Sequence, residues 1–183
     1  MNVYPLVSVC VVTYNSSEFI EQTLQSVKKQ SYTNIELVIS DDCSKDDTVS
    51  LCNKWINNNN NNFISTIISV MPHNSGVSAN CNNAVKYCNG EWIIMLGGDD
   101  TLKDDAVQNY ITFINCNPNA SIIFSQYQYF TDNLNGVEYG KVRPNTQEIG
   151  LFNLETGKQL ENLLYCNFLP APSYIISAKL ARS

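Results

Sequence analysis

Two pairs of neighbouring carboxylates have the clearest potential for chemistry in this sequence. Asp41 and Asp42 end one apolar run, and Asp99 and Asp100 follow another through two glycines. Adjacent carboxylates repel each other, so each pair is stable only where water or a cation compensates its charge. A hard divalent cation such as Mg²⁺, held by one or two carboxylates and by substrate phosphates, is one such partner. The alternative is a solvated loop that caps the helix after it.

The apolar runs before these carboxylates are typical of buried strands, because strands of a parallel sheet are short and continuously apolar. Four such runs are present, at residues 6–13, 35–40, 63–70 and 92–96. Apolar residues at helical spacing follow the first three, at about residues 20–30, 48–56 and 77–88. This alternation predicts βαβ units with right-handed crossovers, and therefore an α/β fold with a parallel sheet.

The rest of the chain carries weaker patterns. They predict a helix, a strand, a helix and a final strand, in that order, at residues 103–115, 120–130, 154–164 and 173–177. Turn-forming residues occur at 133–136, two prolines lie within 170–172, and residues 136–150 show no clear pattern. The asparagine-rich run 57–62 is expected to be a surface loop.

Composition limits the class of protein. The 183 residues are 44% hydrophobic and 15% charged, which indicates a globular chain with a substantial core and no linker. A net charge of -6 without a basic stripe argues against non-specific nucleic-acid binding. No apolar run approaches the roughly 18 residues of a membrane span, and no signal peptide is visible. The seven scattered cysteines suggest neither a disulfide framework nor a zinc site, so we expect a reduced, cytoplasmic protein.

Three loops at the carboxyl ends of predicted strands gather polar residues, at 13–15, 41–44 and 97–100. Because the carboxyl ends of parallel strands share one edge of a sheet, these loops can converge on one ligand. The two common glycine-rich phosphate-binding motifs, G-x-x-x-x-G-K-[ST] and G-x-G-x-x-G, are both missing. A nucleotide bound at this edge would therefore depend on carboxylates and a metal.

Four segments resemble the motifs of family 2 glycosyltransferases with the GT-A fold. They lie at residues 9–15, 30–48, 74–82 and 90–100, and the last corresponds to the segment with the metal-binding D-x-D. The resemblance covers about the first 105 residues. It implies a three-layer α/β/α nucleotide-diphospho-sugar transferase fold with a mainly parallel central sheet. We expect one domain over residues 1–183, with a nucleotide-binding half at about 1–100 and the start of an acceptor half at about 101–183.

The resemblance also implies roles for individual residues. Asp42 would accept hydrogen bonds from uracil or another base, and Asp41 would support its loop. Asp99 would bind Mn²⁺ or Mg²⁺ bridging the diphosphate, whose leaving-group charge the metal neutralises as a Lewis acid. Asp100 would contact metal-bound water or the sugar. The nucleotide-binding residues implied in this way are Val12, Thr13, Tyr14, Asp41, Asp42, Gly76, Ser78, Gly98 and Asp100.

The sequence departs from the family pattern at three positions. Gly97 replaces the first aspartate of D-x-D, Cys43 replaces the glycine of D-D-G-S, and Cys81 replaces the arginine of the third motif. An inverting enzyme also needs a carboxylate general base for the acceptor hydroxyl. That base is expected beyond Ser183, so the chain would be a truncated N-terminal portion that is inactive alone. Glutamates outside any matching motif are candidates by residue type only, namely Glu138, Glu148, Glu155 and Glu161.

The function implied by the resemblance is metal-dependent, inverting transfer of a hexose or N-acetylhexosamine from a nucleotide-sugar. The donor would be a UDP-sugar, and the acceptor a glycan or lipid-linked molecule in surface polysaccharide synthesis. The full-length protein would associate peripherally with the membrane. One alternative is a nucleotide-sugar-binding module without transferase activity, which the departures favour. Another alternative is a phospho-acceptor signalling domain. Such a domain needs a lysine on its last strand and an acceptor aspartate on its third strand, and neither arrangement is found.

Two further features have an ordinary and a functional interpretation. Tyr127, Tyr129 and Phe130 alternate as in a half-buried strand, but aromatic rings can also line a sugar-binding cleft. His73, the single histidine, is expected in a surface loop, with contact to a donor phosphate as the alternative.

Overall fold

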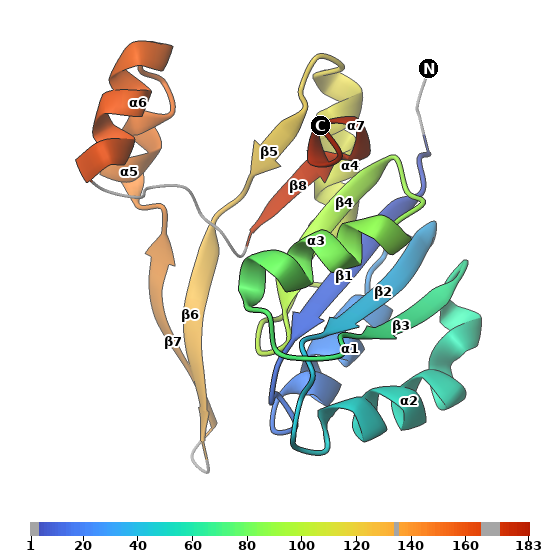
Figure 1. Cartoon of the computed structure of the whole chain (residues 1–183). Helices are drawn as coiled ribbons and strands as arrows, with labels where there is room; N and C mark the ends of the chain where they lie inside the picture. Colours follow the sequence, from blue (N-terminus) through green and yellow to red (C-terminus); the bar gives the residue numbers. More distant parts are fainter. Residues whose placement is uncertain (1–3, 134–135, 166–172) are drawn as a thin grey trace. The chain divides into compact units, whose positions relative to one another are not determined.

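A computed structural model describes residues 4–133, 136–165 and 173–183. Helices and strands alternate over the first hundred residues, as the sequence pattern predicts (Figure 1). The elements are β1 (Val7–Thr13), α1 (Ile20–Lys28), β2 (Ile35–Asp41), α2 (Thr48–Asn59), a 3₁₀ helix (Asn60–Asn62), β3 (Thr66–Val70), α3 (Val77–Tyr87), β4 (Trp92–Gly97), α4 (Ala106–Cys116), β5 (Ile122–Phe124), β6 (Tyr127–Asn133), β7 (Gly136–Arg143), α5 (Thr146–Leu151), α6 (Thr156–Tyr165), β8 (Tyr174–Ser177) and α7 (Ala178–Ala181).

A six-stranded sheet in the order β3-β2-β1-β4-β8-β5 contains most of the strands. β1 pairs in parallel with both β2 and β4, and β2 pairs in parallel with β3. β8 runs antiparallel to β4. The predicted mainly parallel sheet is therefore confirmed. β6 and β7 form a separate antiparallel pair.

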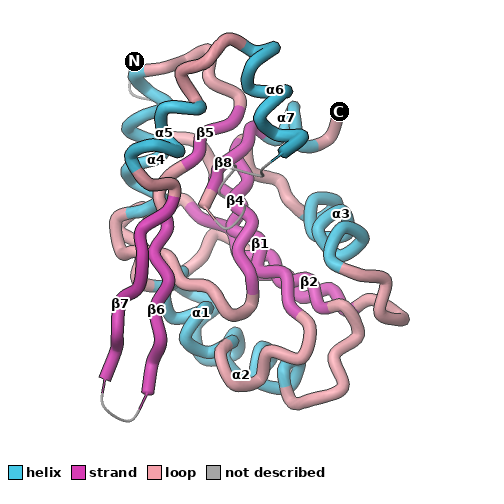
Figure 2. Tube along the Cα trace, turned by 90° about the vertical axis from the view of Figure 1, so that its left-hand side faces the viewer, coloured by secondary structure: helices cyan, strands magenta, loops and turns pink. Residues whose placement is uncertain are grey.

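The strand order decides which helices cover which face. From β1 the chain adds β2 and β3 on one side, and then returns to the other side of β1 with β4. Right-handed crossovers therefore place α1 and α2 on one face and α3 on the opposite face. Figure 2 shows α3 on one side of β1 and β2, and α1 on the other. The expected three-layer α/β/α arrangement is present.

The apolar core lies between the sheet and helices α1, α2 and α4. Val7, Val9 and Val11 of β1 are fully buried in it, because alternate residues of a strand point to the same face. Removing each such side chain from water contributes roughly 1.5–3 kcal/mol to folding. The residues between them point to the other face, where Ser8 Oγ donates a hydrogen bond to Glu36 Oε1 at 2.5 Å.

The prediction of a single strand over residues 120–130 is wrong, because this stretch forms β5 and β6 in two different sheets. The two residues between β5 and β6 form hydrogen bonds with other parts of the chain. Ser125 N donates to Ser173 O at 2.9 Å, and Gln126 Nε2 donates to Pro144 O at 2.9 Å. A continuous apolar and aromatic pattern does not reveal that its two ends pair with different strands.

Two more regions differ from expectation. β7 and α5 lie where the sequence shows no clear pattern, because β7 is exposed along nearly its whole length and lacks apolar alternation. The asparagine-rich run is helical rather than a loop, since α2 continues to Asn59 and a 3₁₀ turn follows. Asn59 is bonded on both sides: its Nδ2 donates to Trp55 O, and Lys28 Nζ donates to its Oδ1, each at 2.7 Å.

The chain divides into two compact units. The first unit runs to Ile123 and resumes at Ile175, and the second unit is Phe124–Tyr174. These boundaries differ from the expected division near residue 100, so the assignment of donor and acceptor halves stays a prediction. The prolines within 170–172 and part of the 133–136 turn lie outside the described residues.

Candidate active site

The carboxyl ends of β1, β2 and β4 lie level with one another. Thr13 is in register with Asp41 of β2, and Val12 with Gly97 of β4. The pairing continues past the end of β2, where Asp42 N donates to Thr13 O at 2.9 Å. The three polar loops that the sequence singles out therefore leave the sheet at one edge, at the point where the strand order reverses. Open α/β sheets bind their ligands at such points.

Gly98 packs directly on the end of β1. Its N–H donates to Val12 O at 2.9 Å, and its carbonyl accepts from Thr23 Oγ1 of α1 at 3.0 Å. A Cβ at this position would lie 2.6 Å from Thr13 Oγ1, so only glycine fits. Thr13 is 3% exposed, and its Oγ1 is the one buried side-chain oxygen of the described residues without a hydrogen-bond partner. Such a group at a strand end is a candidate ligand contact.

Asp99 and Asp100 follow in a tight turn that Asp100 N closes by donating to Gly97 O at 3.1 Å. A Cβ on Gly97 would lie 2.9 Å from both Asp99 Oδ1 and Asp100 Oδ2, so the two carboxylates flank the same point. Asp99 is exposed and Asp100 is partly buried. Burial, and then the negative charge of Asp99, raise the pKa of Asp100 above its ordinary value. The folded protein therefore disfavours the charged form of Asp100 beside Asp99.

The carboxylates of Asp99 and Asp100 fit a hard divalent cation that the substrate also helps to hold. Within the described residues, no group of three or more histidine, cysteine or acidic side chains could enclose a metal. Asp99 and Asp100 could supply one or two oxygen ligands, which leaves most positions for phosphates and water. Mg²⁺ and similar ions are commonly bound in this way.

The second loop is fastened by Asp41. Its two oxygens accept from Ser44 N at 2.8 Å and from Ser44 Oγ at 2.5 Å. Ser44 Oγ in turn accepts from Asn15 N at 2.8 Å, and Asn15 Oδ1 accepts from Lys45 N at 2.8 Å. Asp41 is 1% exposed. Its carboxylate thus supports the loop and ties that loop to the one after β1.

Cys43 has a left-handed backbone conformation, with φ of 64°. A side chain in this region costs roughly 1–2 kcal/mol, and glycine adopts it freely. The geometry explains why the related motif has glycine at this position. The thiol makes two contacts, with Lys45 Nζ at 3.1 Å and with Pro72 O at 3.7 Å.

Asp42 organises the loop before α3. Its Oδ1 accepts from Ser75 N and its Oδ2 from Gly76 N, each at 2.8 Å. Gly76 has φ of 85° and ψ of 166°, a region that is essentially restricted to glycine. Asp42 is only 3% exposed, so its main contacts in this structure are with the backbone of the protein.

The remaining expected site residues are more exposed. Tyr14 is 44% exposed, and Ser78 in the first turn of α3 and His73 in the preceding loop are also exposed. The surface position expected for His73 is therefore confirmed. Cys81 is half-buried, and burial raises the pKa of its thiol, which is opposite to what a nucleophile requires.

Asn80 is a site-positioning residue that the sequence does not single out. Its Nδ2 donates to Thr13 O at 3.2 Å and to Ser40 O at 3.0 Å, and its Oδ1 accepts from Ser40 Oγ at 2.6 Å. It thereby joins α3 to the ends of β1 and β2. Asn80 lies four residues before the buried Ala84, so a polar residue on the buried face of this helix is the available signal.

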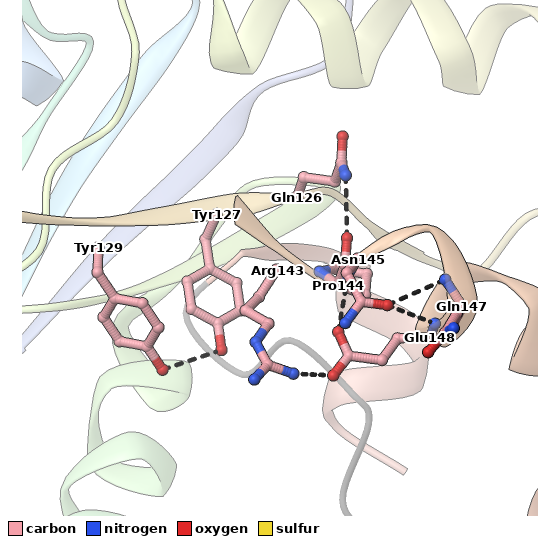
Figure 3. Close-up of polar contacts among 8 residues, drawn as sticks. All are labelled: Gln126, Tyr127, Tyr129, Arg143, Pro144, Asn145, Gln147 and Glu148. Atoms are coloured by element: carbon pink, nitrogen blue, oxygen red, sulfur yellow. Dashed lines mark hydrogen bonds and ion pairs between the residues drawn. The ribbon is translucent and has the colours of Figure 1, made fainter. Parts of the chain in front are cut away.

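One group of polar contacts in the second unit surrounds Glu148 (Figure 3). Arg143 Nη1 donates to its Oε1, and Asn145 N donates to its Oε2 at 2.7 Å. Asn145 Oδ1 accepts from Gln147 N at 2.9 Å and from Glu148 N at 3.0 Å, which completes a capping box at the start of α5. Both oxygens of Glu148 are thus used in holding the helix start.

The other residues of interest in this unit are open to solvent. Glu138 and Glu155 are exposed, and Glu161 is exposed and paired with Lys158 at 2.9 Å. Tyr129 is 60% exposed, and its ring stands edge-on to that of Tyr127 at 5.4 Å between centroids. A role for these tyrosines in acceptor binding stays a prediction.

The mainly parallel sheet, with carboxylates that follow β2 and β4, matches the GT-A fold that the sequence motifs imply. Comparison with protein families matches residues 8–168 to "Glycosyl transferase family 2". The chain belongs to that family. Within the described residues, no helix is both long enough and apolar enough to cross a bilayer.

Known proteins support the same assignment. The chain is 36% identical over 105 residues to chondroitin synthase from Escherichia coli, covering 57% of this chain and 14% of that protein. TarS from S. aureus in complex with UDP superposes with a TM-score of 0.70 at 24% identity, over 96% of this chain and 48% of that one.

A third match is the mannosyltransferase PcManGT from Pyrobaculum calidifontis, in complex with GDP-Man and Mn²⁺. Its TM-score is 0.60 at 24% identity, over 64% of this chain and 34% of that one. The chain therefore spans less than half the length of each of these proteins.

Proposed function

We propose that this chain is the donor-binding part of a metal-dependent, inverting glycosyltransferase that uses a UDP-sugar. The observation that carries the proposal is that Thr13, Asp42 and the Asp99–Asp100 pair lie at one edge of the sheet. The chain that carries them belongs to glycosyl transferase family 2. The complexes of TarS with UDP and of PcManGT with GDP-Man and Mn²⁺ support a nucleotide-sugar donor.

The donor base would lie against Val12, Thr13 and Tyr14. Tyr14 offers an exposed ring for stacking, and Thr13 Oγ1 has an unused hydrogen-bonding capacity. Asp42 holds Ser75 and Gly76 with one lone pair on each oxygen, so each oxygen retains a second lone pair for a base N–H. Gly76 and Ser78 at the start of α3 would then approach the phosphates, because a helix N-terminus attracts anions.

The metal would bind at Asp99, with Asp100 nearby and diphosphate oxygens completing the coordination. Bound Mn²⁺ or Mg²⁺ would neutralise the charge on the departing nucleoside diphosphate. The raised pKa of Asp100 beside Asp99 favours such an ion, because a cation between the two carboxylates removes their mutual repulsion.

In the reaction, the acceptor hydroxyl oxygen attacks the anomeric carbon while the bond from that carbon to the diphosphate breaks. The hydroxyl proton passes to a carboxylate base, and the nucleoside diphosphate leaves. We propose a glycan or lipid-linked acceptor, by analogy with a relative named as a chondroitin synthase. Tyr127 and Tyr129 would take part in holding the acceptor sugar.

A thermal-shift screen of UDP, GDP and CDP with and without Mn²⁺ tests the donor site. At about 100 times its Kd, a ligand stabilises the folded state by about 2.7 kcal/mol. For a chain of this size that corresponds to a rise in melting temperature of about 5–10 °C. We expect the rise with UDP to be larger when Mn²⁺ is present.

The variant Asp99→Asn should lose the part of the UDP response that depends on Mn²⁺. Asp105→Asn is the matched control, because Asp105 is also exposed but begins α4 without a side-chain cap bond. An equal shift with and without Mn²⁺, or an unaltered response of Asp99→Asn, would contradict the metal assignment. Donor binding by the full-length protein without transfer of the sugar to any acceptor would favour the alternative of a binding module.

A further inference from the structure

Two cysteines far apart in the sequence meet beneath the sheet. Cys10 lies in the middle of β1, and Cys88 immediately follows the last residue of α3. They are separated by 78 positions, yet their sulfur atoms are 3.0 Å apart. Neither residue belongs to the proposed donor site. Both are free thiols in this structure.

The two thiols differ in their access to solvent. Cys10 is fully buried and Cys88 is 4% exposed. Cys88 also lines an open cavity of about 720 Å³, which a small oxidant can enter. The cavity is lined by Asn82, Val85, Lys86, Cys88, Asn89, Ala181, Arg182 and Ser183. Of the two cysteines, Cys88 thus lines the cavity, and the Cys10 sulfur lies 3.0 Å from the Cys88 sulfur.

The charges around the pair also differ for the two sulfurs. The hydrogen bond from the Cys10 thiol, with smaller contributions from Ser8 and Arg182, lowers the pKa of Cys88 below its ordinary value. The same hydrogen bond, burial and the nearby Glu36 carboxylate raise the pKa of Cys10. Cys88, which lines the cavity, is therefore assigned as the attacking thiol, and Cys10, which is fully buried, as the second thiol.

We propose that Cys88 and Cys10 form a redox-active dithiol, in which Cys88 reacts with peroxide and Cys10 resolves the product as a disulfide. The Cys88 thiolate attacks one oxygen of hydrogen peroxide and the O–O bond breaks. Hydroxide is the leaving group, and Cys88 becomes a sulfenic acid. The Cys10 sulfur then attacks the Cys88 sulfur and water leaves, carrying the Cys10 proton. In sum, two thiols lose two electrons and two protons, and one peroxide becomes two waters.

The geometry requires little movement. A disulfide has an S–S distance of about 2.05 Å, so the two sulfur atoms need to approach by roughly 1 Å. The bond would join β1 to the end of α3, the helix that also carries Asn80 against the ends of β1 and β2. Oxidation should therefore stabilise the first unit and raise its melting temperature.

Peptide mapping of the unmutated protein tests the proposal directly. The fully reduced, folded chain is treated with hydrogen peroxide, free thiols are alkylated, and the digest is analysed by mass spectrometry. We expect a linked Cys10–Cys88 peptide, the loss of two titratable thiols, and recovery of both with dithiothreitol. Exclusive oxidation of other cysteines, such as the exposed Cys116, would overturn the proposal.

Variants separate the two roles. In Cys10→Ser, the Cys88 sulfenic acid should persist and be trapped by dimedone, because no resolving thiol is present. In Cys88→Ser, Cys10 should remain reduced at the same peroxide concentration. Cys52→Ser is the control, because Cys52 is also buried but lies in the apolar core cluster, so this variant should leave the linked peptide unchanged. Equal peroxide reactivity of Cys10 in Cys88→Ser would contradict the assigned order of attack.

Discussion

Gly98 and Thr13 are packed so closely that a single methyl group on Gly98 would fall 2.6 Å from Thr13 Oγ1. This contact joins the loop that carries the acidic pair to the end of the central strand. The backbone contributes as well, because Gly98 N donates to Val12 O and Thr23 Oγ1 donates to Gly98 O. The contact of Gly98 with Thr13 therefore sets the position of the next residue, Asp99, relative to β1.

The variant Gly98→Ala should lose stability and donor binding together. Thr13 lies in a buried central strand and cannot move aside, so the added methyl group should cost about 1–3 kcal/mol of unfolding free energy. Gly97→Ala is the matched control for stability, because the atoms nearest to its Cβ would be side-chain atoms of Asp99 and Asp100 rather than a buried strand. Urea denaturation of both variants measures the difference. Equal stabilities would show that the contact with Thr13 does not constrain the loop.

The variant Asp100→Asn should be more stable than the unmutated protein when metal and donor are absent. The raised pKa means that the folded state disfavours the charged form of Asp100, so a neutral amide should fit better at pH 7. The same change should weaken the Mn²⁺-dependent response to UDP, because one carboxylate of the pair is lost. Thermal melts with and without Mn²⁺ and UDP check both effects. A lower melting temperature of the ligand-free variant would contradict the expectation.

The variant Cys43→Gly should stabilise the protein. It removes the cost of roughly 1–2 kcal/mol for a left-handed side chain, offset by the larger backbone entropy of glycine in the unfolded chain. We expect a net gain of about 0.5–1 kcal/mol, or roughly 1–4 °C in melting temperature. Cys43→Ala is the control, because alanine keeps a Cβ and should show no gain. The idea fails if both variants melt at the same temperature.

Glu36 should make stability depend on pH. It is 1% exposed, and its oxygens accept from Ser8 Oγ, Asn89 N and Gly90 N. Burial alone would raise its pKa, but these hydrogen bonds outweigh that effect and lower the pKa below the ordinary value. A lowered folded-state pKa gives stability that is present above the unfolded value of about 4.3 and is lost as pH falls through the folded value.

The variant Glu36→Gln tests this dependence, because glutamine keeps the shape of the side chain without its charge. At pH 7 it should be less stable by roughly 1–3 kcal/mol, the range for lost hydrogen bonds to a buried charged group. The difference between the two proteins should shrink as pH is lowered below about 4. Urea denaturation across this pH range measures it. A difference that is constant with pH would exclude the carboxylate as its cause.

Local patterns in the sequence located the strands and helices of the first hundred residues, except for the helical asparagine-rich run at 57–62. Each buried strand is a short apolar run, and each helix repeats apolar residues at helical spacing. Burial is therefore visible as a local pattern of apolar residues. The acidic pairs could be located at strand ends for the same reason. β7 shows no such pattern, because it is exposed and is held by hydrogen bonds to β6. The division of residues 120–130 between two sheets likewise depends on partners elsewhere in the chain.

The sequence by itself thus determined the α/β class and the parallel pairing of its early strands, and it supplied the residues that we propose to bind a nucleotide and a metal. Only the tertiary structure decided that Gly98 must lack a side chain, that Asn80 joins α3 to two strand ends, and that Cys10 meets Cys88. The physical reason is the range of the interactions. Periodicity records whether a residue is buried, whereas a contact between residues some eighty positions apart depends on how the whole chain packs.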